Sequence, residues 1–337
     1  MPPKERYGYA VARLRALENR LLDEAVFQRM IDCDTLEAAV KVLGETPYSV
    51  WLAELKSPLE FDKAIEAELH RCYEEIQGFT PETEIVSLLR LPYDIHNVKT
   101  LIKGQILAMR GGKRRLDLLT SLGNIDTDTL TLAVEGDDCK GLPFGLDRAV
   151  PEALAVWEQE QNMLAVEKSL DKTYFRALLK TAGDLKMEEV VKWVKSRIDG
   201  ENLKTMLRLS HISINRAQTE SFLYEGGTIP VNKLAPLALE PLESWSRLLG
   251  FSEISKLLSA FTEDANFNSQ LVLFEKNLDD YITECIAPVR FATFEPANVV
   301  RYLWAREIEA KNLRVILVSV ANGVNKDTIR EVLRHVC

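Results

Sequence analysis

Acidic side chains are the residues of this 337-residue chain whose type and spacing come closest to supporting chemistry. Asp279-Asp280 begins the Asp-Asp-x-x-Asp pattern with which all-helical isoprenoid synthases hold magnesium and diphosphate, but Thr283 stands at the last acidic position. Asp137-Asp138 lies between glycines, in a predicted loop. Magnesium is recruited only where several carboxylates converge. A metal-dependent helical enzyme is therefore the weakest of the hypotheses that we weigh.

Other patterns of catalysis and cofactor binding are missing from the sequence. No P-loop pattern GxxxxGK[ST] and no GxGxxG occurs, so the glycine cradle that holds phosphates is lacking. None of the histidines lies in an HExxH pattern or in a Cys/His cluster with zinc spacing. These histidines are His70, His96, His211 and His335. The sequence predicts no catalytic residue, no cofactor and no metal.

Charge and cysteine usage restrict the environment and the partners. The formal net charge of −9 disfavours nucleic acid, because phosphate neutralisation needs clustered Lys and Arg. The one compact basic run, 113–115, follows two glycines and is expected in a solvated turn. Dispersed cysteines indicate reduced thiols. The uncharged stretch 315–321 is too short to cross a membrane, and the charged N-terminus lacks a signal-peptide core. We expect a soluble, cytoplasmic protein.

Helical periodicity dominates the chain, and no pair of alternating strands joined by a hairpin turn is evident. Asp34 and Glu37 resemble a capping box, Gly44 stands where a C-terminal cap belongs, and Pro92 is expected to end a short helix that begins at Thr80-Pro81. Further helical runs are predicted at 146–169, 170–197, 201–215, 232–248, 252–260, 269–285 and 295–321. The predicted fold class is all-α.

An internal repeat is the most informative feature of the sequence. An acid, an asparagine and a base recur with constant spacing near the end of each third of the chain. The three sets are Asp94, Asn97 and Lys99; Asp199, Asn202 and Lys204; and Glu309, Asn312 and Arg314. A second signature precedes each set, at 62–66, 167–171 and 275–279, and a weaker one opens the units at Ile31, Ile125 and Ile229. We predict helical repeats at 1–110, 111–217 and 218–337.

The repeated asparagine shares a helix face with apolar or small residues, so its amide is expected to point inward. A buried amide needs hydrogen-bond partners, and losing them costs about 1–3 kcal/mol. The amide could bind a ligand, or it could tie its helix to a neighbouring backbone. Because it recurs in every unit, we favour the structural interpretation.

Several segments together resemble one known family. They are Tyr7–Glu18, Leu43–Tyr48, Tyr93–Gly104, Arg197–Lys204 and Glu307–Arg314. Their order and spacing resemble the C subunit of bacterial and archaeal A/V-type rotary ATPases, which is homologous to the d subunit of the eukaryotic V-ATPase. Gly200-Glu201 departs from the family pattern, and eukaryotic-type extensions are absent, which favours a prokaryotic origin.

The resemblance implies a three-fold pseudo-symmetric, funnel-shaped helical protein with a central cavity and without catalytic activity. It implies two partners: the membrane proteolipid rotor ring and the central shaft of the soluble ATPase head. The expected function is to couple the shaft to the ring, for ATP-driven proton or sodium transport or for ATP synthesis, peripheral to the membrane. A generic helical scaffold for another partner is the alternative.

Overall fold

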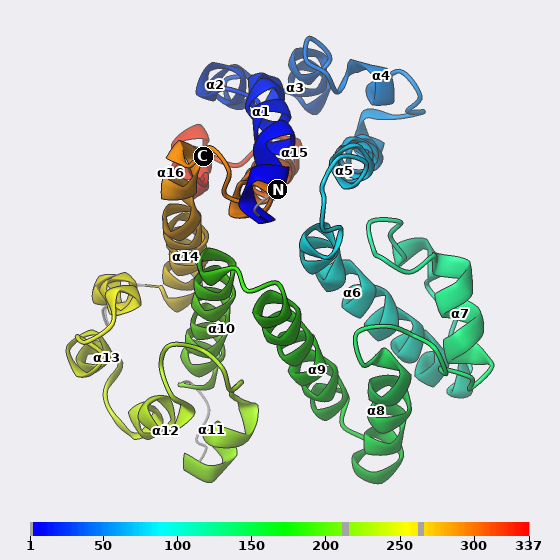
Figure 1. Ribbon diagram of the computed structural model, residues 1–337, viewed down its shortest axis with the longest axis vertical. Helices are drawn as coiled ribbons and strands as arrows, with labels where there is room; N and C mark the ends of the chain where they lie inside the picture. Colours follow the sequence, from blue (N-terminus) through cyan, green and yellow to red (C-terminus); the bar gives the residue numbers. More distant parts are fainter. Residues whose placement is uncertain (1–2, 211–215, 262–265, 337) are drawn as a thin grey trace. The chain divides into compact units, whose positions relative to one another are not determined.

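The computed structural model describes residues 3–210, 216–261 and 266–336 of the protein. Within these residues every regular element is a helix, and no strand occurs (Figure 1). The predicted all-α class is confirmed. His211 and the end of the run predicted at 201–215 lie outside the described residues.

The chain divides into two compact units. The first combines Met1–Glu82 with Lys195–Cys337, and the second is Thr83–Val194. This division follows contacts and not internal similarity, so the repeat boundaries 1–110, 111–217 and 218–337 stay a prediction.

The first unit contains both the beginning and the end of the chain. Its α-helices are α1 (Gly8–Leu17), α2 (Glu24–Ile31), α3 (Leu36–Leu43), α4 (Ser49–Leu52), α5 (Phe61–Gln77), most of α10 (Glu188–Leu209), α11 (Arg216–Phe222), α12 (Val231–Leu234), α13 (Leu242–Leu248), α14 (Phe267–Ile286), α15 (Ala297–Ala321) and α16 (Lys326–Val332). Its 3₁₀ helices are η1 (Pro3–Tyr7), η2 (Glu18–Arg20), η3 (Pro58–Glu60), η5 (Ala235–Leu239), η6 (Glu253–Ala260) and η7 (Ala287–Phe291).

Helix α15 is the centre of the first unit. It contacts α1, α2, α3, α5, α14 and α16, and the run from Ala297 to Ile308 is buried on nearly every face. A helix surrounded in this way must also bury its polar residues, and Arg301, Arg306, Glu309 and Asn312 are all at most 2% exposed. Each of them therefore needs a partner inside the protein.

The second unit is built around α6 (Glu84–Met109). Helix α6 packs against α7 (Thr127–Glu135) and α9 (Met163–Asp184), and α8 (Leu146–Glu160) packs along α9 (Figure 1). The short η4 (Leu116–Leu118) and the first residues of α10 complete it. Its core consists of aliphatic side chains such as Val98, Ile102 and Leu178, all fully buried.

Pro92 does not end a helix, and the prediction at this position is wrong. The residue lies inside α6, which runs on to Met109. A proline inside a helix removes one backbone hydrogen bond, at a cost of about 3 kcal/mol. Here the apolar neighbours Leu88, Leu89 and Leu91 are all buried, and this packing holds the helix together across the break.

Several other helix boundaries differ from the expected ones. The helix expected to begin at Thr80-Pro81 begins at Glu84, the break expected between 197 and 201 lies inside α10, and the run expected at 232–248 is divided into α12, η5 and α13.

The N-cap of α3 is Thr35, whose hydroxyl accepts from the N–H of Ala38 at 3.2 Å, so the Asp34–Glu37 capping box is wrong. Gly44 is the C-cap of α3, as predicted. The boundary expected at 169/170 falls instead at Gln161, in a left-handed conformation, and at Asn162, which caps α9. Asparagine is a residue type favoured at helix N-caps, so Asn162 was a signal for this break that the sequence interpretation did not use.

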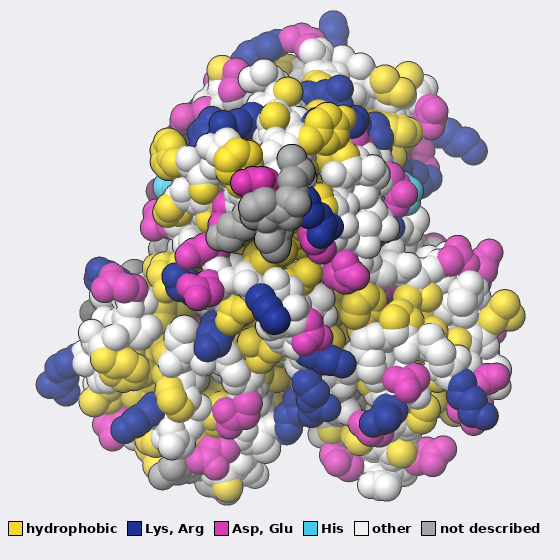
Figure 2. Space-filling model, in the orientation of Figure 1, with side chains coloured by type: hydrophobic (Ala, Val, Ile, Leu, Met, Phe, Trp, Pro, Cys, Tyr) yellow, Lys and Arg dark blue, Asp and Glu magenta, His cyan; other side chains and the backbone are white. Residues whose placement is uncertain are grey.

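The surface carries charges of both signs together with exposed apolar side chains such as Tyr9, Leu59 and Phe291. Side chains of both signs are interspersed on the face shown in Figure 2. The basic run 113–115 is exposed and follows α6 in a non-helical segment, as predicted. Within the described ranges no helix has the length and apolar content needed to cross a bilayer.

Candidate functional site: repeated polar junctions and a buried ion cluster

The three repeated asparagines make one and the same pair of hydrogen bonds. The Nδ2 of Asn97 donates to the carbonyl of Thr120 at 2.8 Å, and its Oδ1 accepts from the N–H of Thr120 at 2.9 Å. Asn202 pairs in this way with Tyr224, at 2.8 Å for both bonds. Asn312 pairs with Arg334, at 2.8 and 2.9 Å. Each amide thus binds the backbone N–H and C=O of a residue 22 or 23 positions further along the chain, and these bonds do not involve that residue's side chain.

The repeated acids bind the backbone just before a helix. Asp94 accepts from the N–H of Ile125 at 3.0 Å, and Asp199 from the N–H of Ile229 at 3.0 Å. Glu309 accepts from the N–H of Leu22 at 2.6 Å. Each of these donors directly precedes the N-cap residue of α7, α12 or α2. Because the donor lies outside the helix, it has no intrahelical carbonyl, and the acid supplies the acceptor.

Two glycines make room for the aspartates. A Cβ on Gly123 would clash with Oδ1 of Asp94, and one on Gly227 would clash with Oδ1 of Asp199. Both glycines stand two residues before the isoleucine whose N–H is bound. A larger residue would therefore push the carboxylate away from its donor. At the junction of Glu309 the corresponding residue is Arg20, and the acid is longer by one methylene group.

The repeated bases form partly exposed ion pairs. Lys99 pairs with Asp171 at 2.6 Å, and Arg314 pairs with Asp62 at 2.7 Å. Lys204 instead pairs with Glu201 on its own helix, at 2.6 Å.

Each of the helices α6, α10 and α15 also carries a basic residue that pairs with the first acidic residue of a second signature. On α15 this basic residue is again Arg314. These pairs are Lys103–Glu167, Arg208–Glu275 and Arg314–Asp62. Exposed pairs contribute about 0–1 kcal/mol each.

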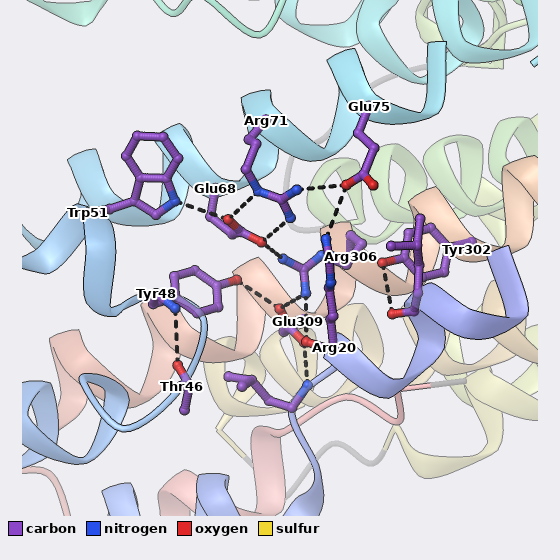
Figure 3. Close-up of polar contacts among 12 residues, drawn as sticks. Arg20, Thr46, Tyr48, Trp51, Glu68, Arg71, Glu75, Tyr302, Arg306 and Glu309 are labelled. Carbon is purple, nitrogen blue, oxygen red and sulfur yellow. Dashed lines mark hydrogen bonds and ion pairs between the residues drawn. The ribbon is translucent and has the colours of Figure 1, made fainter. Parts of the chain in front are cut away.

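A buried ion cluster surrounds the third acid (Figure 3). The guanidinium of Arg306 lies 2.7 Å from Glu68 and 2.7 Å from Glu309, and all three side chains are at most 2% exposed. Tyr48 donates to Glu309 at 2.7 Å. Trp51 donates to Glu68 at 3.0 Å.

The cluster extends outward from Glu68 to the surface (Figure 3). Arg71 binds both oxygens of Glu68, at 2.7 and 2.9 Å, and also Glu75 at 2.7 Å. Glu75 in turn accepts from Arg20 at 3.2 Å. The cluster therefore joins α5 and α15 to the segment that leads into α2.

The pKa values in these sites are set by burial and by the direct partners. Burial raises the pKa of Asp94, Asp199 and Glu309, although their N–H donors favour the ionised form. For Glu68 burial acts in the same direction, but hydrogen bonds from Arg71 and Trp51 and the charge of Arg306 outweigh it and hold the pKa below its usual range. Glu68 thus has more hydrogen-bond donors than each of the other three acids, and two of its donor residues, Arg71 and Arg306, are cationic.

Asp279 and Asp280, the strongest candidates for metal binding in the sequence, have protein partners. Asp279 accepts from Lys311 at 2.9 Å and from Arg334 at 3.1 Å. Asp280 pairs with Lys276 at 2.7 Å and accepts from the N–H of His335 at 2.8 Å. Among the described residues no group of three or more His, Cys, Asp or Glu side chains could hold a metal ion.

Sequence reasoning missed part of these sites. The segments Gly123-Asn-Ile125 and Gly227-Thr-Ile229 are themselves repeated, and this pattern could have located the partners of the aspartates. In the first predicted repeat the equivalent residue is Leu22 and not Ile31, which is the last residue of α2, so that alignment was wrong. In the ion cluster, the pairs Glu68–Arg71, Arg71–Glu75 and Arg306–Glu309 have helical i,i+3 or i,i+4 spacing and could have been noticed in the sequence, but the pair Glu68–Arg306 could not, because its residues are far apart in the chain.

Comparison with known proteins places the chain in a family. Residues 10–332 match the family model described as ATP synthase (C/AC39) subunit. The C subunit of the A-type ATP synthase of Methanocaldococcus jannaschii is 27% identical, over 97% of this chain and 86% of that protein. The C subunit of the V-type sodium ATPase of Enterococcus hirae is 24% identical, over 96% of both chains. The C subunit of the A-type ATP synthase of Desulfurococcus sp. is 26% identical, over 98% of this chain and 91% of that protein. Because the family model covers nearly all of the sequence, the chain belongs to the ATP synthase (C/AC39) subunit family.

Proposed function

We propose that this protein is the non-catalytic central-stalk subunit of a V/A-type rotary ATPase, which couples the shaft of the soluble ATPase head to the proteolipid rotor ring. The observation that carries the proposal is the family match over residues 10–332. Relatives named as subunits of both A-type ATP synthases and a V-type sodium ATPase support the rotary complex and leave the transported ion open.

A mechanical role needs a body that does not yield under load. The proposal is supported by the way in which each acid–asparagine helix is tied to backbone segments by buried hydrogen bonds at three similar junctions. Such bonds are expensive to break, at about 1–3 kcal/mol for each buried group left unpaired. We propose that the repeated acids and asparagines serve this stiffness and bind no ligand.

The alike junctions also support three pseudo-symmetric units. Similar units that make similar head-to-tail contacts close into a ring where the rotation permits. We propose a funnel with a central cavity, which receives the shaft at one mouth and lies on the rotor ring at the other, on the cytoplasmic face of the membrane.

The test is removal of the chain from its complex. We expect the ring and the soluble head to lose their association and ATP-driven ion transport to stop, while the head still hydrolyses ATP. Adding back the purified chain should restore transport. A complex that stays coupled without this chain would contradict the proposal, and capture of neither shaft nor ring by the chain would favour a scaffold for another partner.

The absence of catalysis has its own test. The purified chain with magnesium and ATP, or with a diphosphate ester, should show only background turnover, and Asp279→Asn should not change it. Magnesium-dependent turnover that Asp279→Asn abolishes would show a metal-dependent active site instead.

A further inference from the structure

A small hollow of the first unit, here named the basic hollow, lies between α10, α14 and α15. Its volume is about 350 Å³, at the lower end of the range of roughly 300–1,000 Å³ that is usual for small-molecule pockets. Its charged lining residues are Lys204, Glu275, Asp279, Lys311, Arg314 and Arg334. Four of these are cations and two are carboxylates, so the hollow has a formal charge of +2 in a chain whose net charge is −9.

The close approach of two helices brings Lys204 to the basic hollow. A Cβ on Gly200 would lie 2.6 Å from Cδ1 of Leu278, so α10 and α14 lie side by side at this point (Figure 1). Lys204 stands four residues after Gly200 and therefore on the same face of α10. On α15, Lys311 and Val315 are likewise one turn apart, and both line the hollow. Three helices thus direct side chains to one place.

Comparison with the first junction shows that Lys204 has a different partner from its counterpart. At the first junction Lys99 pairs with Asp171 on another helix, at 2.6 Å. Lys204 and Asp279 hold the corresponding positions of the repeat. Lys204 pairs instead with Glu201 on its own helix, at 2.6 Å. The ion pair that joins the helices at the first junction is therefore replaced here by other contacts.

The two acids of the hollow have cationic partners. The carboxylate of Asp279 accepts from Lys311 at 2.9 Å and from Arg334 at 3.1 Å. Burial raises the pKa of Asp279, but the charges and hydrogen bonds of Lys311 and Arg334 outweigh it and hold the pKa below its usual range. Glu275 pairs with Arg208 at 2.8 Å. One carboxylate thus balances two cations of the hollow, and the other is balanced from outside it.

The two remaining cations of the hollow pair with acids outside its lining. Glu201 is the partner of Lys204, and Asp62 is the partner of Arg314 at 2.7 Å. The side chains of these two acids are 32% and 64% exposed. Exposed ion pairs contribute only about 0–1 kcal/mol, so an anion inside the hollow can compete with them for the cations.

We propose that the basic hollow binds a small dianion of the phosphate type, either free phosphate or a phosphate monoester. The lysines supply compact positive charges, and the arginines supply N–H forks that match the oxygen atoms of a phosphate group. The formal charge of the lining equals the charge of the dianion with opposite sign. Leu278 and Val315 offer an apolar contact to the organic part of an ester.

A methyl-detected NMR titration of the full chain tests the site. Inorganic phosphate and glycerol 3-phosphate are added in separate titrations at constant ionic strength, with chloride as the balancing anion. The methyl signals of Leu278 and Val315 should shift saturably, with a Kd on the order of 1 mM or below. Tighter binding of the ester would identify an esterified ligand, and tighter binding of phosphate would identify the free ion. Shifts that do not saturate, or that chloride reproduces, would overturn the proposal.

A pair of lysine variants separates the site from general charge effects. Lys204→Met removes the charge, keeps the aliphatic stem and should weaken phosphate binding at least ~10-fold. Lys192→Met is the matched control, because Lys192 also lies on α10 and pairs with Glu189 three residues earlier, as Lys204 pairs with Glu201. It should change the Kd by less than ~2-fold. Equal weakening by both variants would overturn the proposal, because the anion would then respond to net charge alone.

The opposite sign is expected when the competing acid is removed. Glu201→Gln releases Lys204 from its ion pair and should tighten phosphate binding at least ~3-fold. Glu189→Gln makes the same change of net charge at the control pair and should have less than half of that effect. These residues are all partly exposed, and an unchanged unfolding temperature shows that each variant is folded. Binding that Glu201→Gln leaves unchanged or weakens would contradict the role given to Lys204.

Discussion

At the scale of single residues, the junctions depend on amides that cannot be replaced by a side chain of another type. Asn202 is fully buried, and its amide is both donor and acceptor to the backbone of Tyr224. Asn202→Ala leaves a buried N–H and a buried C=O without these partners. We expect a loss of about 2–4 kcal/mol in the free energy of unfolding, measured by urea denaturation.

The control for this variant is Asn232→Ala, at an exposed asparagine. It should change the free energy of unfolding by less than about 0.5 kcal/mol. A similar small change for Asn202→Ala would mean that water or a shifted backbone satisfies Tyr224, and that the junction is not a structural tie.

The ion cluster predicts a pH dependence with a definite sign. Glu68 has its pKa held below the ordinary value of 4.5, since Arg71, Trp51 and Arg306 overcome the effect of burial. The unfolded chain therefore takes up the proton at higher pH than the folded one. The stabilisation is complete above that ordinary value and is lost as the pH falls through the lower folded value.

The variant that tests this sign is Glu68→Gln. At pH 7 it should destabilise the protein by about 3 kcal/mol, because it breaks a buried ion pair with Arg306. The difference from the wild type should shrink as the pH is lowered to about 3.5. Glu54→Gln, at an exposed acid, is the control and should show no such trend. A difference that is constant with pH would show that Glu68 does not titrate as described.

What could be predicted at this scale was the identity of the polar residues and not their partners. The constant spacing of Asn97, Asn202 and Asn312 was visible in the sequence, and helical periodicity placed them inward. Their partners lie 22 or 23 residues away in irregular segments, where no periodicity exists. Glu68 and Arg306 lie 238 positions apart in the sequence, so their ion pair produces no local sequence pattern.

At the scale of elements, close approach explains two of the glycines. Ala at position 123 or 227 would drive a methyl group into the carboxylate of Asp94 or Asp199. We expect Gly123→Ala and Gly227→Ala to destabilise the protein by about 1–3 kcal/mol, as overpacking does. Thermal denaturation measures the effect.

Gly183→Ala is the matched control for this pair. Gly183 lies near the end of α9, and a Cβ there would meet nothing within 4 Å. Alanine is the better helix former, so this variant should gain about 0.5–1 kcal/mol. If all three glycine variants shifted stability in the same direction, helix propensity or chain entropy would explain them and close approach would not.

Gly200, which departs from the family pattern, is also explained by a close approach. A Cβ at this position would lie 2.6 Å from Cδ1 of Leu278, so α10 and α14 approach closely here. Gly200→Ala in a helix should stabilise by propensity, but the contact with Leu278 reverses the sign, to a loss of about 1–2 kcal/mol. The double variant Gly200→Ala/Leu278→Val should be less destabilised than the sum of the single variants. Strict additivity of the two changes would contradict the contact.

Helix existence was predictable, and helix ends were less so. The long helical runs that correspond to α14 and α15 were predicted to within about two residues, because apolar spacing and Pro296 defined them. The helix end predicted at Pro92 was wrong because local propensity does not include the burial of the neighbouring Leu88, Leu89 and Leu91. Tertiary packing outweighs a single helix-breaking residue.

At the scale of the whole molecule, internal similarity and compactness divide the chain differently. The acid of each junction binds a segment that starts the next predicted repeat, and Glu309 binds Leu22 at the beginning of the chain. Two of these junctions, those of Asp199 and Glu309, lie in the first compact unit, and that of Asp94 lies in the second. The same contact therefore stabilises different units.

This distribution predicts which calorimetric unfolding transition each of three equivalent substitutions should affect. Asp199→Ala and Glu309→Ala should lower the unfolding temperature of the first unit, and Asp94→Ala that of the second, each by several degrees for a loss of about 2–3 kcal/mol. Glu309→Ala should have the largest effect, because it also leaves Arg306 and Tyr48 short of a buried partner. Hydrogen exchange assigns the transitions, with the amides of α15 reporting the first unit and those of α9 the second. If every variant lowered both transitions equally, the two units would unfold as one cooperative body, and the junctions would act on the whole chain at once.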